Sequence, residues 1–407
     1  MLAWILGIIL FALGICVSIA LHEAGHMGAA KMFGMRVRRY FIGFGPTIWS
    51  FRRGDTEYGL KAIPAGGFCD IAGMTALDEV TAEEAPRAMW RYATWKRFVV
   101  MAAGSITHFI IGFIILYLMA ISMGLPNLDL RNFDSNTARP LIGTVNDCVV
   151  DKNSESTDEC PPDAAAPAKD AGLRPGDVVQ SIDDTPTPSW GDMVRTVEGL
   201  SGPAEFVVRR GSETVTLTVD VAQVSTDDGK VGAIGVSLSQ DVLPPPVNHY
   251  SAGDGVGGAV SFTGEMFVGV WNGILAFPEK IPKVIEAIGG GERPDDTPIS
   301  VVGASIIGGD AVERGLWELF LLLLATLNFF VGVFNLLPLL PLDGGHIAVL
   351  FYEKVRDWLR RLRGKPAGGP VDYSKLSAVT MVFILIGGAV VLLTVTADIV
   401  NPIRLPQ

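Results

Sequence analysis

Apolar residues gather in four long runs of the chain, separated by stretches that are polar or rich in glycine and proline. Each run has about the 20 residues that an α-helix needs to cross about 30 Å of hydrocarbon. The 407 residues are 49% hydrophobic and only 18% charged, which is too apolar for an average soluble protein. The pattern predicts a polytopic α-helical membrane protein whose four transmembrane helices span residues 3–26, 97–121, 316–346 and 376–398.

The first run has a second interpretation, because an apolar N-terminal run can be a cleaved signal peptide. It lacks the basic residues with which a signal peptide starts, and cleavage near its end would strand the polar residues 22–26. We therefore expect the first run to be a transmembrane helix.

Two stretches between the runs have distinct patterns. Residues 36–70 are short β-branched and aromatic segments broken by glycine and proline, with a turn at Arg53-Gly54-Asp55, and predict a membrane-associated β-hairpin region. Residues 246–315 contain an apolar stretch, 262–277, that resembles a fifth span. Its five glycine, asparagine and threonine interruptions favour an amphipathic helix on the outer leaflet instead.

A separate small domain is expected at residues 125–245. Residues 171–184 have the pattern of a helix end at Gly172, a Pro-Gly turn and an alternating strand, and residues 206–219 that of a hairpin with a Gly-Ser turn. These segments resemble a PDZ domain of the circularly permuted bacterial type, which implies an α+β fold that binds peptides at a sheet edge. An unrelated small β domain with a Pro-Gly turn is the alternative.

The predicted domain organisation has four parts. They are a first part of the membrane core, the PDZ domain, an extracytoplasmic amphipathic or linker segment, and a second part of the membrane core, at residues 1–124, 125–245, 246–315 and 316–407.

The distribution of basic residues predicts the orientation. Residues 31–97 carry eleven Lys and Arg against seven Asp and Glu, and residues 352–375 carry seven against three, whereas residues 125–315 carry thirteen against twenty-nine. Short connections rich in Lys and Arg stay in the cytoplasm. We therefore expect the PDZ domain and both termini outside a bacterial plasma membrane. The net charge of −11 gives no support to nucleic-acid binding.

Four cysteines are too few for a disulfide framework. Cys148 and Cys160 lie in the segment expected outside the cell, where a disulfide is chemically permitted. A bridge between them and two unbridged thiols are both open from the sequence.

His22-Glu23-Ala24-Gly25-His26 follows directly on the first apolar run. Residues four apart share a helix face, so His22 and His26 can bind one Zn²⁺ while Glu23 acts as general base on water. The pentad also occurs by chance, but ionisable residues in a membrane helix are functional by default. The pattern predicts a catalytic zinc site in the membrane.

Asp343 is the predicted third ligand, since a catalytic zinc normally has three. It follows the third run in Leu342-Asp343-Gly-Gly-His346, and His346 is its competitor. The first and third spans run in the same direction, so Asp343 and the two histidines are expected at one depth.

The residues around Asp343 have expected roles of their own. Pro338 and Pro341 should break the third helix before the ligand, and the two glycines after Asp343 should let the chain turn tightly. Asn335, one turn before Pro338, is a candidate donor to a scissile carbonyl or its oxyanion. His108, within the second run, is interpreted as a buried histidine bonded to a backbone carbonyl or a hydroxyl, with a ligand or substrate contact as the alternative.

The two motifs, Asn-x-x-Pro-x-x-x-x-Asp-Gly and HExxH, and the PDZ-like segment between them resemble the bacterial site-2 protease family. More narrowly, they are similar to its single-PDZ regulator-of-sigma-factor proteases of actinobacterial type. The resemblance implies His22, His26 and Asp343 as ligands of one Zn²⁺, Glu23 as base and Asn335 as a helper at the carbonyl.

The resemblance also implies a substrate-binding edge. Ile63-Pro64-Ala65-Gly66-Gly67 is similar to the family's membrane-associated β segment, which pairs with an unwound substrate.

The expected function is that of a zinc-dependent intramembrane endopeptidase, which cuts within or near the transmembrane segment of single-span proteins in regulated intramembrane proteolysis. The resemblance implies anti-sigma factors as substrates after a prior site-1 cut, and peptide termini as ligands of the PDZ domain. The alternative is a non-proteolytic membrane PDZ scaffold with a structural metal, against which Glu23 argues because structural zinc needs no base. Metal transport would need more intramembrane ligands than this chain offers.

Overall fold

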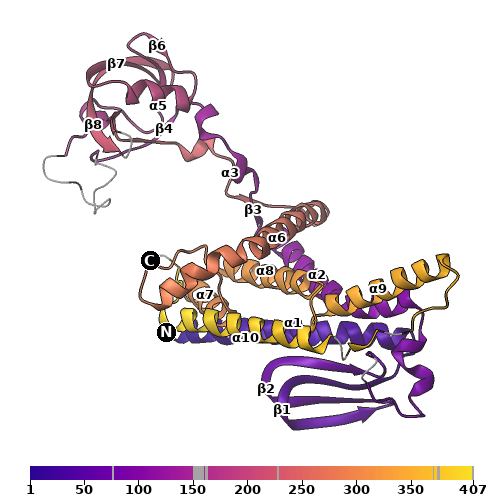
Figure 1. Ribbon diagram of the computed structural model, residues 1–407. Helices are drawn as coiled ribbons and strands as arrows, with labels where there is room; N and C mark the ends of the chain where they lie inside the picture. Colours follow the sequence, from indigo (N-terminus) through magenta and orange to yellow (C-terminus); the bar gives the residue numbers. More distant parts are fainter. Residues whose placement is uncertain are drawn as a thin grey trace. The chain divides into compact units, whose positions relative to one another are not determined.

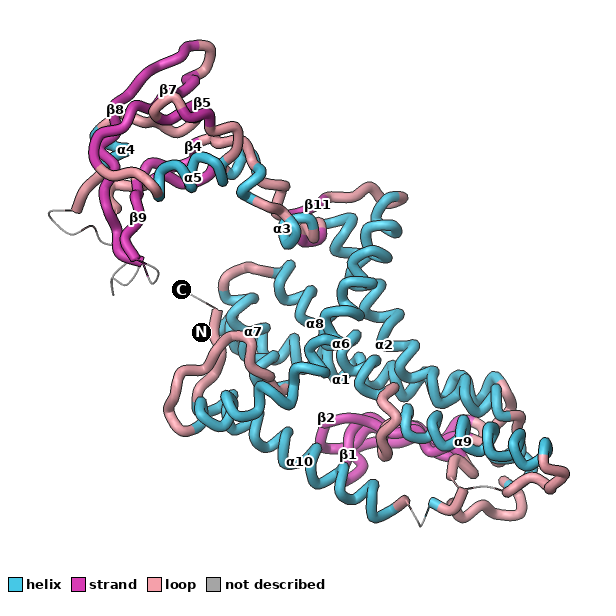
Figure 2. The backbone as a smooth tube through the Cα atoms, turned by 45° about the horizontal axis from the view of Figure 1, so that its top comes forward, coloured by secondary structure: helices cyan, strands magenta, loops and turns pink. Residues whose placement is uncertain are grey.

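The computed structural model describes residues 1–75, 78–149, 160, 164–226, 229–369, 371–373 and 376–405, with the backbone alone at 64, 65, 131 and 132. The chain forms two compact units, one of residues 1–125 with 249–407 and the other of residues 126–248. Figures 1 and 2 show both units and label many of their elements.

Five described helices of the first unit are long and apolar enough to cross a membrane. They are α1 (Leu2–Met32), α2 (Thr94–Ser122), α6 (Asp254–Ile288), α8 (Trp317–Asn335) and α10 (Ser377–Val400). Four of them, α1, α2, α8 and α10, overlap the predicted spans. The fifth, α6, lies where we expected an amphipathic helix, and its most apolar window has the lowest mean hydropathy of the five, 1.2. The predicted count of four spans is therefore not confirmed, although several apolar helices are present.

The third predicted span, 316–346, is not one helix. Helix α8 ends at Asn335, and α9 (Asp343–Leu362) begins with the predicted ligand. Pro338 and Pro341 lie in the connection, as expected for residues without a backbone N–H. A short helix, α7 (Val301–Glu313), packs against the N-terminal half of α1, where Phe11 and Ile15 contact Ala304 and Ala311 in one buried cluster.

A glycine-rich β hairpin of the first unit, made of β1 (Val37–Arg53) and β2 (Thr56–Ile71), lies beside α1 (Figures 1 and 2). Both strands bend, so that residues 39–42 pair with residues 57–60 on one side and with residues 67–70 on the other. The bends occur at Gly43, Gly45 and Gly66, whose φ values lie between 82° and 126°. The predicted hairpin region is thus present, and residues 67–71 form one edge of its pairing.

The second unit has a core of its own around a sheet of order β6-β5-β7-β8-β9. These strands are β5 (Val178–Ile182), β6 (Thr185–Pro186), β7 (Gly202–Arg210), β8 (Glu213–Thr226) and β9 (Gly229–Ala233). The amphipathic helix α5 (Trp190–Glu198) packs onto the sheet. Its Met193 and Val197 belong to the same buried cluster as Phe206 and Val219 of the sheet.

Shorter elements complete this unit. A two-stranded pair joins β4 (Ile142–Val145) to β10 (Val236–Leu238), and β3 (Leu125–Pro126) pairs with β11 (Val247–Asn248) at the ends of the segment. Helices α3 (Asp129–Asn132) and α4 (Pro167–Asp170) are single turns. One-turn 3₁₀ helices lie at 135–137 and 240–242 in this unit, and at 85–87 and 89–91 in the first unit.

Two local predictions in this unit are confirmed. Gly172 has φ +78° directly after α4, and β5 starts at Val178; Gly211, with φ +62°, lies in the turn between β7 and β8. Cys148 and Cys160 form a disulfide, which decides between the bridged and unbridged states that the sequence allowed.

Candidate metal centre

His22 and His26 continue the buried stripe of α1. The stripe advances by three or four residues at a time, which keeps its members on one helix face, and it consists of Gly7, Phe11, Ile15, Ser18, His22 and His26. Both histidines are almost fully buried, with 6% and 5% of their surface exposed. The sequence therefore places two imidazoles inside the helix bundle rather than on its outer surface.

Asp343 meets the two histidines from another part of the chain. Its Oδ2 lies 3.4 Å from Nε2 of His22 and 3.2 Å from Nε2 of His26, and the two Nε2 atoms are 3.2 Å apart. The structure thus brings together the three residues that the sequence predicted as ligands, although more than 300 residues of chain separate Asp343 from the two histidines.

These three atoms fit a tetrahedral metal site. Zinc binds imidazole nitrogen and carboxylate oxygen at about 2.0–2.2 Å, so neighbouring ligand atoms in a tetrahedron lie about 3.3 Å apart. The three observed separations of 3.2–3.4 Å match that edge. In addition, Oδ2 of Asp343 is buried without a hydrogen-bond partner among the described residues, as expected for an atom that faces a cation.

Helix α2 supports the histidines from behind. Nδ1 of His26 lies 2.7 Å from the backbone oxygen of Val100, which fixes the proton on Nδ1 and leaves Nε2 for the metal. Gly104 makes the space for both rings: a Cβ atom there would lie 2.4 Å from Nε2 of His26 and 2.5 Å from Cε1 of His22. At this position only glycine lets α2 lie so close to the site.

Glu23 is a residue of α1, and its side chain lies against the β hairpin. It is half-buried, and the backbone of Cys69 in β2 hydrogen-bonds its carboxylate. A Cβ atom at Gly67 would lie 3.3 Å from Cγ of Glu23, so the edge of the hairpin passes directly beside the predicted base. Burial, followed by the charge of Glu23, raises the pKa of the Cys69 thiol. Cys69 therefore stays protonated and does not compete with Glu23 as a base.

The predicted segment 63–67 enters this edge. Ile63 pairs with Phe44 and is exposed, while Gly67 pairs with Ile42 and is half-buried. The side chains of Pro64 and Ala65 lie outside the described residues. Among the predicted substrate-binding residues that the structure describes, Gly67 lies next to the candidate catalytic group.

Asn335 is the last residue of α8 and is half-buried. The connection after it folds back onto α9, since a Cβ atom at Gly344 would lie 2.2 Å from the backbone oxygen of Leu336. Asn335 and Asp343 thus stand at the two ends of one tight loop.

The glycines after Asp343 have a different role from the predicted one. The chain turns before Asp343, and Gly344 and Gly345 are helical residues of α9 that lie against the backbone of residues 336–340. Their small size is needed for close packing, so the prediction that they form a tight turn after the ligand was wrong.

His346 and His108 lie near the three candidate ligands but have other contacts. His346 contacts the Tyr373 hydroxyl through Nδ1 at 3.2 Å and does not join the group of three. His108 is buried against His22, with 4.9 Å between the ring centres, and its Nδ1 lies 2.9 Å from Oδ1 of Asn328. The sequence interpretation of His108 as a buried, satisfied residue is confirmed, but its partner is a side-chain amide that we did not identify. An asparagine within the apolar run of α8 was the available signal.

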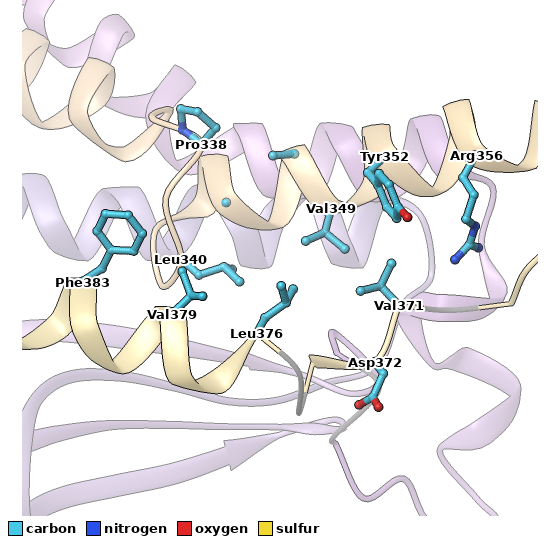
Figure 3. A pocket seen from close by; sticks show the side chains of 12 residues that line it. Pro338, Leu340, Val349, Tyr352, Arg356, Val371, Asp372, Leu376, Val379 and Phe383 are labelled. Atoms are coloured by element: carbon cyan, nitrogen blue, oxygen red, sulfur yellow. The ribbon is translucent and has the colours of Figure 1, made fainter.

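Two largely apolar cavities flank the connection between α8 and α9. One, of about 660 Å³, is lined by Pro338, Leu340, Val349 and Phe383 among others, and Figure 3 shows these side chains between α9 and the start of α10. The second, of about 700 Å³, lies on the side of Thr94, Phe98 and Ile347. None of the three candidate ligands, His22, His26 and Asp343, lines either cavity.

Comparison with known proteins agrees with this site. The profile described as peptidase family M50 matches residues 10–379. The chain is 46% identical over 413 residues to zinc metalloprotease Rip1 of Mycolicibacterium smegmatis, covering 99% of each chain. It is 45% identical over 415 residues to zinc metalloprotease Rip1 of Mycobacterium tuberculosis, covering 99% of this chain and all of the relative. Membrane metalloprotease ARASP of Arabidopsis thaliana, a chloroplast protein, is 27% identical over 91% of this chain and 74% of its own.

The family profile covers far more than half of the chain, and the Rip1 relatives align over nearly all of it. The resemblance drawn from the two motifs is thereby confirmed. The chain therefore belongs to peptidase family M50.

Proposed function

We propose that this protein is a zinc-dependent intramembrane endopeptidase that cuts within or near the transmembrane segment of single-span proteins. The observation that carries the proposal is the group of three candidate ligand atoms, 3.2–3.4 Å apart, on the apolar helix α1 and at the first residue of α9, with Glu23 beside them. The relatives named zinc metalloproteases support zinc as the metal.

His22, His26 and Asp343 would hold the ion, whose contribution when bound is to polarise a carbonyl and to acidify water. Glu23 is then placed to take a proton from the attacking water and to return it to the leaving amine. Asn335, at the start of the loop that ends in Asp343, would donate a hydrogen bond to the scissile carbonyl.

The hairpin edge supplies a way to hold the substrate. A transmembrane helix hides its backbone, so a bond within it must be exposed before hydrolysis. Residues 67–71 pair on one side only within the described residues, and they pass beside Glu23. An unwound substrate segment that adds to this edge would present its backbone to the base.

The second unit is proposed to be a PDZ domain outside the membrane. Its separate core, the sheet and the helix α5 support an independent peptide-binding domain. The Cys148–Cys160 disulfide supports an oxidising compartment for this unit. This PDZ domain would admit substrates already shortened by a site-1 cut. The proposed substrates are anti-sigma factors of bacterial plasma membranes.

Cleavage of a single-span test substrate by the purified chain in detergent tests the proposal. Product should form with the unaltered protein, disappear with a zinc chelator and return when zinc is added back. Glu23→Gln should abolish cleavage while zinc stays bound, and Glu318→Gln, the same change on the exposed start of α8, should leave cleavage unchanged. If Glu23→Gln still cleaves, the assignment of the base is wrong. If zinc binds but several shortened substrates stay intact, the scaffold alternative gains support.

A further inference from the structure

One nitrogen of His22 has no hydrogen-bond partner among the described residues. Its Nε2 lies among the predicted ligand atoms, 3.2 Å from Nε2 of His26, whereas Nδ1 is buried without a hydrogen-bond partner among the described residues. A neutral imidazole that binds a metal through Nε2 carries its proton on Nδ1. With metal bound, His22 would therefore present a buried N–H that needs an acceptor.

The unpartnered nitrogen faces α2. A Cβ atom at Gly104 would lie 2.7 Å from Nδ1 of His22. His108 follows Gly104 by four residues, so it lies on the same face of α2. The His108 and His22 ring centres are 4.9 Å apart. The rings are close enough for an N–H···N bond of about 2.9 Å, but the bond is not made among the described residues, so it would form as metal binding turns the His22 ring.

Asn328 determines which nitrogen of His108 can accept that hydrogen bond. The amide Nδ2 of Asn328 donates to the backbone oxygen of Leu324 at 2.8 Å, so its Oδ1 is the atom that faces Nδ1 of His108 at 2.9 Å. Because an amide oxygen accepts only, His108 carries its proton on Nδ1 and has a lone pair on Nε2. His108 and Asn328 are 2% and 1% exposed, which leaves little room for water to replace either.

We propose that His108 is a positioning residue for the metal ligand His22. In the loaded enzyme Nε2 of His108 accepts the Nδ1–H of His22, and Asn328 holds His108 in the tautomer that makes this possible. The resulting chain of hydrogen bonds runs from α8 through α2 to α1 and orients the His22 ring toward the metal. The inference rests on the proposed function, because it takes His22 as a ligand.

The zinc affinity of the full-length protein in detergent, measured by competition with a chromophoric chelator, tests this role. His108→Leu removes the donor and the acceptor, and should weaken zinc binding about 10–100-fold. His108→Gln keeps an amide oxygen and an amide N–H at the end of the side chain, and should restore most of the affinity. Thr326→Val, which on α8 removes a hydroxyl bonded to the backbone oxygen of Leu322, is the matched control and should bind zinc as tightly as the unaltered protein.

Thermal unfolding of the metal-free proteins separates positioning from a merely structural role. A lower Tm of His108→Leu with unchanged zinc affinity would overturn the proposal, and so would an equal loss in His108→Gln and His108→Leu. If His108→Leu does not fold, Asn328→Leu replaces it: weaker zinc binding supports the relay, and unchanged binding overturns it. If the unaltered protein binds no zinc, the proposed function itself fails.

Discussion

Gly104 of α2 lies so close to His26 of α1 that a single added carbon would occupy the metal-facing side of the imidazole. The added Cβ atom would be 2.4 Å from Nε2 of His26. Neither partner can easily yield, because Nδ1 of His26 is bonded to the backbone oxygen of Val100 and α2 is itself held by the helices around it. The close approach of two helices thus defines the position of a ligand atom.

Gly104→Ala should therefore disable the metal site. We expect zinc affinity and cleavage to fall by more than the about 10–100-fold that residues behind a ligand usually contribute. The measurement is zinc binding and test-substrate cleavage of the purified variant. Gly387→Ala is the control, because a Cβ atom at Gly387 in α10 has no neighbour within 4 Å. Equal activity of the two variants would show that α2 can move away from His26.

The second unit should lose stability at acid pH through Asp177. Burial alone would raise the pKa of this carboxyl group, but two hydrogen bonds from Arg210 and one from the backbone N–H of Arg174 lower it below the ordinary 3.8. A lowered pKa in the fold means that the stabilisation is complete above 3.8 and is lost as the pH falls through the folded pKa. The protection of β7 and β8 against hydrogen exchange, taken relative to the intrinsic exchange rate at each pH, should fall in that range in the full chain.

Asp177→Asn is the matched variant for this effect. It keeps the shape of the side chain but removes the charge that pairs with Arg210, so β7 and β8 should exchange faster at neutral pH and depend less on pH. If the variant loses as much protection on acidification as the unaltered protein does, other carboxyl groups cause the loss.

The sequence was sufficient for four of the five apolar helices and for the candidate ligand pair on α1, because both signals are strong and local. About 20 apolar residues suffice for a span, and His22, Glu23 and His26 lie within one and a half helical turns. Asp343 was identified by a motif and by the expected depth, and the structure brings it to 3.2 Å from His26.

What the sequence did not show depends on contacts between distant residues. The pair of His108 and Asn328 joins positions 220 apart in the chain. The pairing of residues 39–42 on both sides follows from bends at glycines, which leave no periodic pattern. The helix α6 was ambiguous for another reason: its glycines lower the hydropathy of the run without interrupting the helix.

Thiol counting should confirm the disulfide of the second unit. Cys148 and Cys160 are bonded to each other, and the other two cysteines of the chain, Cys16 and Cys69, are not in disulfides. Protein denatured in an alkylating agent should therefore take up two labels without a reductant and four after reduction, as read by mass spectrometry. Four labels without a reductant, from protein purified out of intact cells, would place Cys148 and Cys160 in a reducing compartment and contradict the proposed orientation.

Helix α10 should depend for its attachment on one buried ion pair. Along α10 only Thr394, Ala397 and Asp398 are buried. The carboxylate of Asp398 accepts a hydrogen bond from Arg293 at 2.7 Å, and both side chains are at most 2% exposed. Removing one partner of a buried pair leaves an uncompensated charge, which typically costs about 3–5 kcal/mol.

Arg293→Ala should therefore lower the thermal stability of the protein in detergent far more than the loss of an exposed ion pair does. Lys280→Ala removes the partner of the exposed Asp296, and water screens such a pair so strongly that its loss should change the stability little. The comparison is the Tm of the two variants, followed by protease sensitivity near the C-terminus. Backbone N–H groups of Ser300 and Gly303 also bond Asp398, at 2.6 and 3.1 Å. A Tm of Arg293→Ala equal to that of Lys280→Ala would mean that these two donors alone compensate the buried carboxylate.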